Sequence, residues 1–274
     1  MPSLLSSYIA RIGFLGDVAP DLPTLRALHK AHLRAISYEN LDIHLGRALT
    51  LDEDAIFDKL VNRGRGGWCY EMNGLFARAL RQIGFDVRLL GSAVGRADTS
   101  TGDEHDHLIL KVNLDRPYLA DVGFGNGLRE PIPLEMGEYK QDFFRFALRK
   151  EGERWWFVNH AGQGPGFDFT LREREMSEFA PRCRHLQTSS ESGFVRQTVC
   201  YRQTKHGVVS LRGLVMKTLT AEGERERVIA TPAEYAITLK DMFGLRLSDA
   251  EISALWQLAH ARHVAWVASQ NQTG

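Results

Sequence analysis

Hydrophobic residues in the first third of the chain recur every three or four positions, which is the spacing of an amphipathic helix. These stripes lie at residues 4–12, 22–36, 50–60 and 75–83. Pro23 stands near the start of the second stripe, where a helix tolerates proline. A capping box from Thr50 to Glu53 predicts the start of the third helix. Gly84 ends the last stripe, which predicts a buried helix of roughly four turns.

After Gly84 apolar and polar residues begin to alternate, which is the spacing of half-buried strands. The Asp-Arg-Pro turn signal at 115–117 separates two such runs and predicts a β-hairpin. The predicted strands lie at residues 85–94, 107–114, 118–125 and 155–158, with more from 194 to about 229. Short strands of this kind favour a small barrel or sheet-rich unit. The span 165–192 mixes charges with a serine-rich run, and we interpret it as an irregular connection.

Two capping boxes mark helices at the end of the chain. The sequence Thr-Pro-Ala-Glu from Thr231 begins the first helix, which Gly244 ends. The sequence Ser-Asp-Ala-Glu from Ser248 opens the second.

The composition is that of an ordinary globular protein. Of 274 residues, 43% are hydrophobic and 25% are charged, which excludes disordered and fibrous classes. The formal net charge is zero, so we expect no nucleic-acid partner and no anionic membrane partner. The N-terminus lacks a basic leader with an apolar core, and no run approaches the ~20 apolar residues of a membrane span. Three cysteines at irregular spacing argue against a disulfide framework, so we expect a cytoplasmic protein.

Cys69 falls near the first turn of the helix that ends at Gly84, directly after Gly66 and Gly67. A thiol at a helix N-terminus faces unpaired N–H groups and the positive end of the helix dipole, and both favour the nucleophilic thiolate. The two glycines would let a substrate carbonyl approach the sulfur. The alternative is a cysteine that simply packs in the core.

The predicted hairpin supplies a base and an orienting carboxylate, which a nucleophilic cysteine needs. Suppose that Val112 pairs with Tyr118 across the turn. Asp121 then lies opposite Ile109, and His107 projects from the same face. Diagonal neighbours on one face are roughly 7–8 Å apart at the backbone, a gap that the two side chains can close. An unpaired carboxylate in this apolar strand would be costly, so we expect Asp121 to pair with His107.

Other roles for the same residues stay open. His107 could face solvent at a strand edge, Asp121 could be a turn residue, and His105 is a rival base. We predict no metal site, although three groups carry metal-binding side chains. These groups are the acidic and histidine run 103–107, the pair His29 and His32, and the set Cys183, His185 and Cys200. For the pair His29 and His32 we favour packing or capping within a helical bundle, because no third ligand has a suitable spacing.

Together, a thiol at a helix start, a histidine and an aspartate describe a Cys-His-Asp enzyme that exchanges thioesters, esters or amides through an acyl-cysteine. Spacing does not separate a transferase from a thioester hydrolase or an amide synthase. A non-catalytic scaffold with a buried Cys69 is the remaining alternative.

The run R-G-G-W-C-Y-E-M-N-G-L-F at 65–76 resembles the R-G-G-x-C-x-E-x-N signature of the arylamine N-acetyltransferases. Further blocks across nearly the whole chain resemble that family in the same order. These blocks are L-R-A-L-H-K-A-H at 25–32, Y-E-N-L-D at 38–42, H-L-I-L-K-V from 107, L-A-D-V-G-F-G from 119 and D-M-F-G-L at 241–245.

The resemblance implies an α+β fold in three parts around a cysteine-protease-like Cys-His-Asp core. These parts are an N-terminal helical bundle (1–84), a central β-barrel (85–192) and a C-terminal α/β lid (193–274). It also implies an acyltransferase of xenobiotic metabolism that works by a ping-pong mechanism. Acetyl would pass from acetyl-CoA, as co-substrate and without a metal, to a small aromatic amine or hydrazine. We expect a monomer or weak homo-oligomer.

Carried over by motif, the resemblance makes Cys69 the nucleophile, His107 the acid/base and Asp121 the orienting carboxylate. The substrate pocket would include Phe124, Gly125, Tyr38 and Val94. Tyr38 stands where the family more often has phenylalanine, which makes that wall more polar. Arg65 and Glu39 correspond to residues that look structural and would pair near the site.

Overall fold

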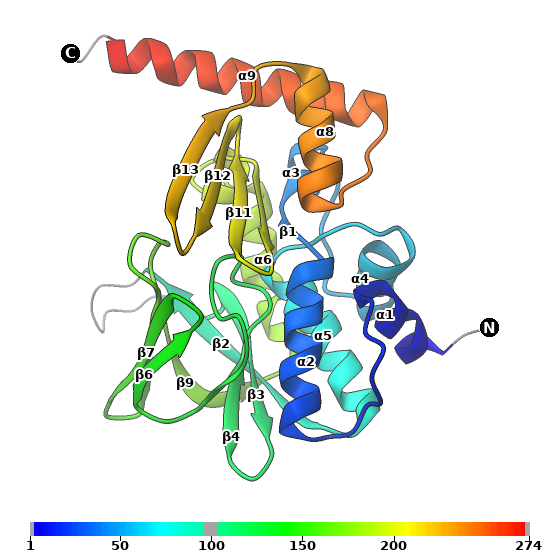
Figure 1. Cartoon of the computed structure of the whole chain (residues 1–274), viewed down its shortest axis with the longest axis vertical. Helices are drawn as coiled ribbons and strands as arrows, with labels where there is room; N and C mark the ends of the chain where they lie inside the picture. Colours follow the sequence, from blue (N-terminus) through cyan, green and yellow to red (C-terminus); the bar gives the residue numbers. More distant parts are fainter. Residues whose placement is uncertain (1–2, 96–103, 272–274) are drawn as a thin grey trace.

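The hydrophobic stripes of the N-terminal third form helices in the computed structural model, which describes residues 3–95 and 104–271. The helices of this part are α1 Leu4–Ile12, α2 Leu22–Ala35, α3 Leu41–His44, α4 Glu53–Phe57, the π-helical turn η1 Asp58–Asn62 and α5 Cys69–Ile83. One apolar cluster joins the buried faces of α1, α2, α4, η1 and α5 to one face of the neighbouring sheet, whereas Leu41 of α3 packs in the C-terminal cluster. Figure 1 shows α2 and α5 running side by side next to that sheet.

The alternating segments form an eight-stranded antiparallel sheet that curves into a nearly closed barrel. Its order is β5-β4-β3-β2-β9-β8-β7-β6. The strands are β2 Asp86–Val94, β3 His107–Asn113, β4 Pro117–Ala120, β5 Ile132–Pro133, β6 Gly137–Gln141, β7 Phe144–Glu151, β8 Arg154–Val158 and β9 Phe167–Arg174. A second apolar cluster, rich in phenylalanine, fills the barrel.

The register of the hairpin places the candidate site. Val112 pairs with Tyr118, and Leu110 pairs with Ala120, as the sequence predicts. β4 ends at Ala120, so Asp121 follows the strand directly. β3 is buried on both faces, because one packs against α5 and the other lines the barrel.

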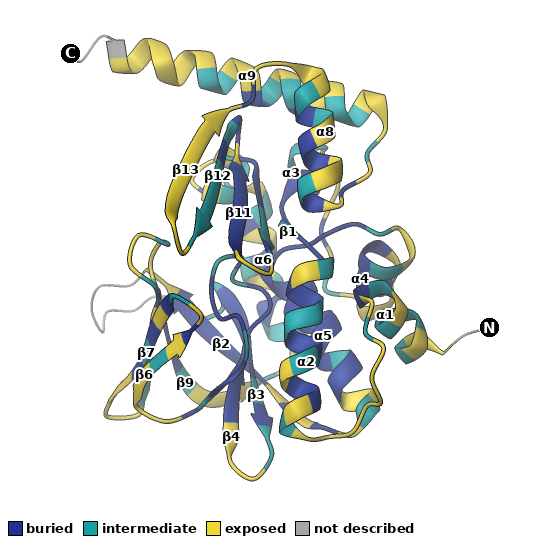
Figure 2. Ribbon diagram, in the orientation of Figure 1, coloured by how far each residue is buried: buried dark blue, intermediate teal, exposed yellow. Residues whose placement is uncertain are grey.

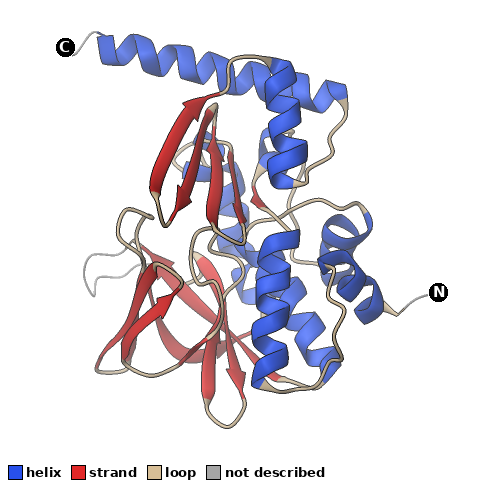
Figure 3. Ribbon diagram, viewed as in Figure 1, coloured by secondary structure: helices blue, strands red, loops and turns tan. Residues whose placement is uncertain are grey.

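The C-terminal part is a five-stranded sheet of order β1-β10-β11-β12-β13, with one long helix beside it and a second across its upper end (Figure 3). Its elements are β1 Tyr38–Glu39, β10 Val199–Gln203, β11 Gly207–Arg212, β12 Val215–Thr220, β13 Gly223–Val228, the short helix α7 Gly193–Arg196, α8 Pro232–Phe243 and α9 Asp249–Asn271. β1 belongs in sequence to the helical part, and its pairing with β10 ties the two ends of the chain together. Figure 2 shows that β13, the outer strand, is exposed.

Three sequence predictions were wrong. The strand predicted at 118–125 covers only Pro117–Ala120, and the chain bends after Asp121 and leaves the sheet. The span 165–192 is not an irregular connection, since it contains β9, the 3-10 turn η2 Met176–Phe179 and α6 Ala180–Thr188. The helix predicted from Thr50 begins instead after Asp52, whose side chain caps it, while the Thr50 hydroxyl accepts the Asp52 N–H. The predicted ends of α5 and α8, at Gly84 and Gly244, are confirmed. The boundaries of the three parts stay a prediction.

Among the described residues no helix has the length and apolar character needed to span a membrane.

Candidate active site

Cys69 is the first residue of α5, at the end where helical N–H groups have no intrahelical partner. The Glu71 carboxylate accepts the Trp68 N–H at 3.2 Å and so caps this end. The approach of Gly123 confines the cysteine further, because a Cβ at position 123 would lie 2.8 Å from the Cys69 Cα. Gly66 instead allows close packing, since a Cβ there would lie 2.2 Å from the Ser37 carbonyl oxygen. The need for glycine at Gly66 is therefore explained by packing.

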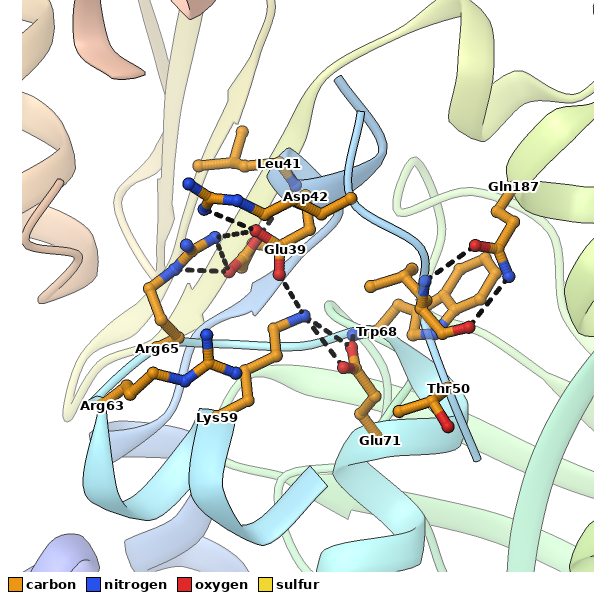
Figure 4. A network of polar contacts seen from close by, with 12 residues as sticks. Glu39, Leu41, Asp42, Thr50, Lys59, Arg63, Arg65, Trp68, Glu71 and Gln187 are labelled. Atoms are coloured by element: carbon orange, nitrogen blue, oxygen red, sulfur yellow. Dashed lines mark hydrogen bonds and ion pairs between the residues drawn. The ribbon is translucent and has the colours of Figure 1, made fainter. Parts of the chain in front are cut away.

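A buried ionic network joins Glu71, near the start of α5, to Lys59, Asp42, Arg65 and Glu39 (Figure 4). The Lys59 ammonium lies 2.9 Å from the Glu71 Oε1 and 2.9 Å from the Asp42 Oδ2. Arg65 bridges Asp42, at 3.1 Å, and Glu39, at 2.8 Å, so the predicted pairing of Arg65 with Glu39 is confirmed. Lys59 was not predicted as part of this network. Its signal was weak, because a lysine on a short amphipathic helix usually faces solvent.

His107 and Asp121 form the predicted pair. The His107 Nε2 lies 2.7 Å from the Asp121 Oδ2, and each residue is only 2% exposed. A carboxylate can only accept, so Nε2 carries the proton and Nδ1 is the nitrogen left to act as a base. The His107 ring packs against Phe124 and Phe167, with centroids at 5.0 and 5.3 Å. His107 therefore does not face solvent, and Asp121 is more than a turn residue.

Asn73 bonds to the Asp121 carboxylate and to the backbone next to His107 and Asp121. It lies one helical turn after Cys69 and donates to the Asp121 Oδ1 at 2.8 Å and to the Leu108 carbonyl at 2.7 Å. Its own oxygen accepts the Val122 N–H at 2.9 Å. No role was predicted for Asn73. The available signal was its position on the buried face of a helix, where an amide needs partners.

The surroundings shift the pKa of the Asp121 carboxyl and the pKa of the Cys69 thiol in opposite directions. Burial alone would raise the pKa of the Asp121 carboxyl, but the His107 imidazole and bonds from His107, Asn73 and the Gly123 N–H together lower it. For Cys69, burial raises the pKa of the thiol well above its ordinary value, and backbone N–H groups offset this only in part. The helix N-terminus therefore does not by itself hold a thiolate here. A proton acceptor is needed.

Cys69 and His107 open into one cavity of about 640 Å³ between the barrel and the C-terminal sheet. Tyr38, Val94 and Phe124 also line it, as expected of substrate-pocket residues. Gly125 is not among its described lining residues; a Cβ there would lie 3.0 Å from the Tyr201 ring. The cavity also has charged walls, among them Arg182, which pairs with Asp106 at 2.5 Å.

The rival sites do not assemble in the part of the chain that the structure describes. The His105 ring packs against Phe179, at 5.4 Å, and does not line the cavity. His29 and His32 are buried, and both rings pack against Phe76 of α5, as the packing prediction expects. Cys183 and Cys200 belong to different apolar clusters. Asp103, at the start of the 103–107 run, lies outside the described residues. Within those residues no three metal-binding side chains converge.

A buried thiol beside a histidine–aspartate pair is the arrangement that acyl transfer through a cysteine requires. Residues 21–252 match the family model described as N-acetyltransferase. A chicken (Gallus gallus) arylamine N-acetyltransferase, the pineal gland isozyme NAT-3, is 34% identical over 89% of this chain and 94% of its own length. The solved arylamine N-acetyltransferase of Salmonella typhimurium superimposes with a TM-score of 0.87 at 29% identity, covering 94% of this chain and 99% of that one.

The Mycobacterium marinum arylamine N-acetyltransferase, solved in complex with CoA, matches with a TM-score of 0.85 at 28% identity, over 93% of this chain and 99% of that one. The chain belongs to the arylamine N-acetyltransferase family, and it is an acyltransferase.

Proposed function

We propose that this enzyme transfers acetyl from acetyl-CoA to an aromatic amine or hydrazine through an acetyl-Cys69 intermediate. Two observations carry the proposal: the 2.7 Å bond between His107 and Asp121, and the cavity that His107 and Cys69 both line. His107 is the acid/base, and Asp121 orients its ring. CoA in the complex of the Mycobacterium marinum relative supports acetyl-CoA as the donor.

In the first half-reaction the Cys69 proton passes to the His107 Nδ1 as the sulfur attacks the thioester carbonyl. The raised pKa of the buried thiol makes this transfer necessary, and the lowered pKa of Asp121 keeps a negative charge beside the resulting imidazolium. Backbone N–H groups in the first turn of α5 stabilise the developing oxyanion. The tetrahedral intermediate collapses by breaking the bond to the CoA sulfur, which takes the proton from His107.

In the second half-reaction the neutral amine attacks the acetyl-cysteine, and His107 accepts the proton that the amine loses. Cys69 then leaves as the sulfur of the broken thioester and regains a proton from His107. Tyr38 and Phe124 suit a flat aromatic acceptor, and their bulk limits the access of water to the intermediate. A volume of about 640 Å³ is within the usual range for such a ligand site.

The test is intact-protein mass spectrometry after acetyl-CoA is added without an acceptor. We expect one acetyl adduct on the wild type, located on Cys69 by peptide mapping, and none on Cys69→Ala. Adding an arylamine should discharge the adduct with formation of the acetylated amine. Discharge by water at the same rate, with no acetylated amine, would instead indicate a thioester hydrolase. An unmodified Cys69 would overturn the proposal.

We further propose a cytoplasmic enzyme of xenobiotic metabolism. All three cysteines are free thiols, which supports a reducing compartment. The predicted monomer or weak homo-oligomer stays a prediction.

A further inference from the structure

His29, on α2, is a fully buried histidine that contacts the loop beyond β4 at two points. Its Nε2 accepts the Asp121 N–H at 3.2 Å. Its Nδ1 lies 3.3 Å from the Arg129 carbonyl oxygen. These partners stand at the two ends of residues 121–129, which we call the aspartate loop. One side chain therefore ties both ends of this loop to the helical part.

These two partners determine the state of the ring. The Asp121 N–H can only donate, so Nε2 must carry a lone pair, and the Arg129 carbonyl can only accept, so Nδ1 must carry the proton. Only the neutral Nδ1–H tautomer satisfies both contacts. Burial agrees with this state, because it lowers the pKa of His29 to about 4. The imidazole is thus a fixed donor–acceptor pair at neutral pH.

The aspartate loop carries three features of the site. It begins with the Asp121 carboxylate, continues with Gly123 against the start of α5, and includes Phe124 against the His107 ring. Asn73 and the Gly123 N–H hold the carboxylate itself, but the peptide N–H of Asp121 has His29 as its partner. Loss of that partner would leave a buried N–H unpaired and free the peptide plane to rotate.

We propose that His29 is a positioning residue for the reaction. Its imidazole holds the aspartate loop so that the Asp121 carboxylate points at His107 and the Phe124 ring packs against the His107 ring. This inference rests on the proposed function, since it concerns the proposed catalytic pair. His29 itself is not among the residues that line the cavity. A displacement of about 1 Å in a catalytic group costs on the order of 10²-fold in rate.

His32 provides a matched control on the same helix. It is equally buried, and its ring lies 5.5 Å from Phe76, as the His29 ring lies 5.7 Å from the same residue. Its bond, however, goes to the Tyr8 hydroxyl at 2.9 Å, away from the aspartate loop. Replacing either histidine removes a similar buried ring, and only one replacement releases Asp121.

The experiment compares His29→Leu, His29→Gln and His32→Leu. It measures thermal unfolding, the single-turnover rate of Cys69 acetylation by acetyl-CoA, and the KM for the donor. We expect His29→Leu to lower the acetylation rate by about 10- to 100-fold with KM nearly unchanged. His32→Leu should lower the unfolding temperature comparably but stay within about threefold of the wild-type rate. His29→Gln, which keeps an acceptor and a donor, should recover much of the loss.

Equal rate losses in the two leucine variants, or a wild-type rate in His29→Leu, would overturn the role of His29. If His29→Leu does not fold, His29→Phe, which keeps a ring without nitrogen atoms, carries the same comparison. Failure of the proposed function looks different, because the wild type itself would then form no adduct on Cys69.

Discussion

Removing the Lys59 ammonium should destabilise the protein more than the loss of any surface charge. Lys59 is 5% exposed, and it stays protonated because the carboxylates around it outweigh burial and raise its pKa. It contacts Glu71 and Asp42 at 2.9 Å each. At an effective dielectric constant of about 20, each contact corresponds to about 6 kcal/mol of attraction, before the cost of burying the charges.

In Lys59→Met, Asp42 keeps Arg65 and Arg47 as partners, whereas Glu71 loses Lys59, the cation that pairs with it. Breaking a buried pair from one side typically costs about 3–5 kcal/mol, because an uncompensated charge remains. For a chain of this size that loss lowers the melting temperature on the order of 10 °C. The same change loosens the cap on Trp68, so acetylation of Cys69 should also slow.

The assay is urea unfolding with Lys30→Met as the control. Lys30 makes a surface pair with Glu130, its side chain is 44% exposed, and such pairs contribute about 0–1 kcal/mol. The pH dependence gives a second signature. Burial already raises the pKa of Glu71, and loss of Lys59 raises it further. As the pH falls, Glu71 of the variant therefore becomes protonated, and the loss of stability relative to the wild type shrinks. A cost below about 1 kcal/mol, or one that does not shrink on acidification, would refute this reasoning.

Three further outcomes follow from the geometry. Gly123→Ala should lower the free energy of unfolding by about 1–3 kcal/mol and slow acetylation, because the added Cβ meets the backbone of Cys69. The control is Gly137→Ala, whose added Cβ has no neighbour closer than 4.0 Å, and it should leave the acetylation rate and the unfolding midpoint unchanged. Asp121→Asn should lower the single-turnover rate by at least about 10²-fold while the protein stays folded, and a smaller loss by stopped-flow assay would argue against the orienting role. The pKa of His29 is lowered from 6.5 to about 4, so between these pH values the unfolded chain binds more protons than the folded one. The free energy of unfolding is therefore highest above pH 6.5 and falls by about 3 kcal/mol as the pH is lowered to about 4. Urea midpoints should show this decline in the wild type and less of it in His29→Gln.

The hairpin could be predicted because its geometry follows from alternation. A strand places every second residue on one face, so the pairing of Val112 with Tyr118 was enough to set Asp121 near His107. The apolar setting of Asp121 supplied the energetic argument for a partner, and the 2.7 Å bond bears it out. The α5 helix could be predicted equally well, since its apolar stripe marks its buried face and Gly84 marks its end.

The span 165–192 was misinterpreted because its elements bury little of themselves. In β9 only the first three residues are buried, and the rest of the strand carries charges on its exposed side. In α6 only Cys183 and Leu186 are buried, which is too short a pattern to reveal a helical period. These elements are held by neighbours that come from elsewhere in the chain, as β9 is by β2 and β8. The local pattern of apolar and polar residues does not reveal pairing between segments that are distant in the sequence.

The polar residues that support the site were missed for a related reason. Lys59 reaches Glu71 across a turn between two helices, and His29 reaches Asp121 across 92 residues. No periodicity relates positions in such pairs, whereas strand register relates His107 to Asp121 directly. Their burial would have been informative, because each carries a polar group that must be satisfied in the core. The sequence therefore does not reveal how α2 and η1 pack against α5 and the aspartate loop. That packing orients His107 and Asp121 towards each other.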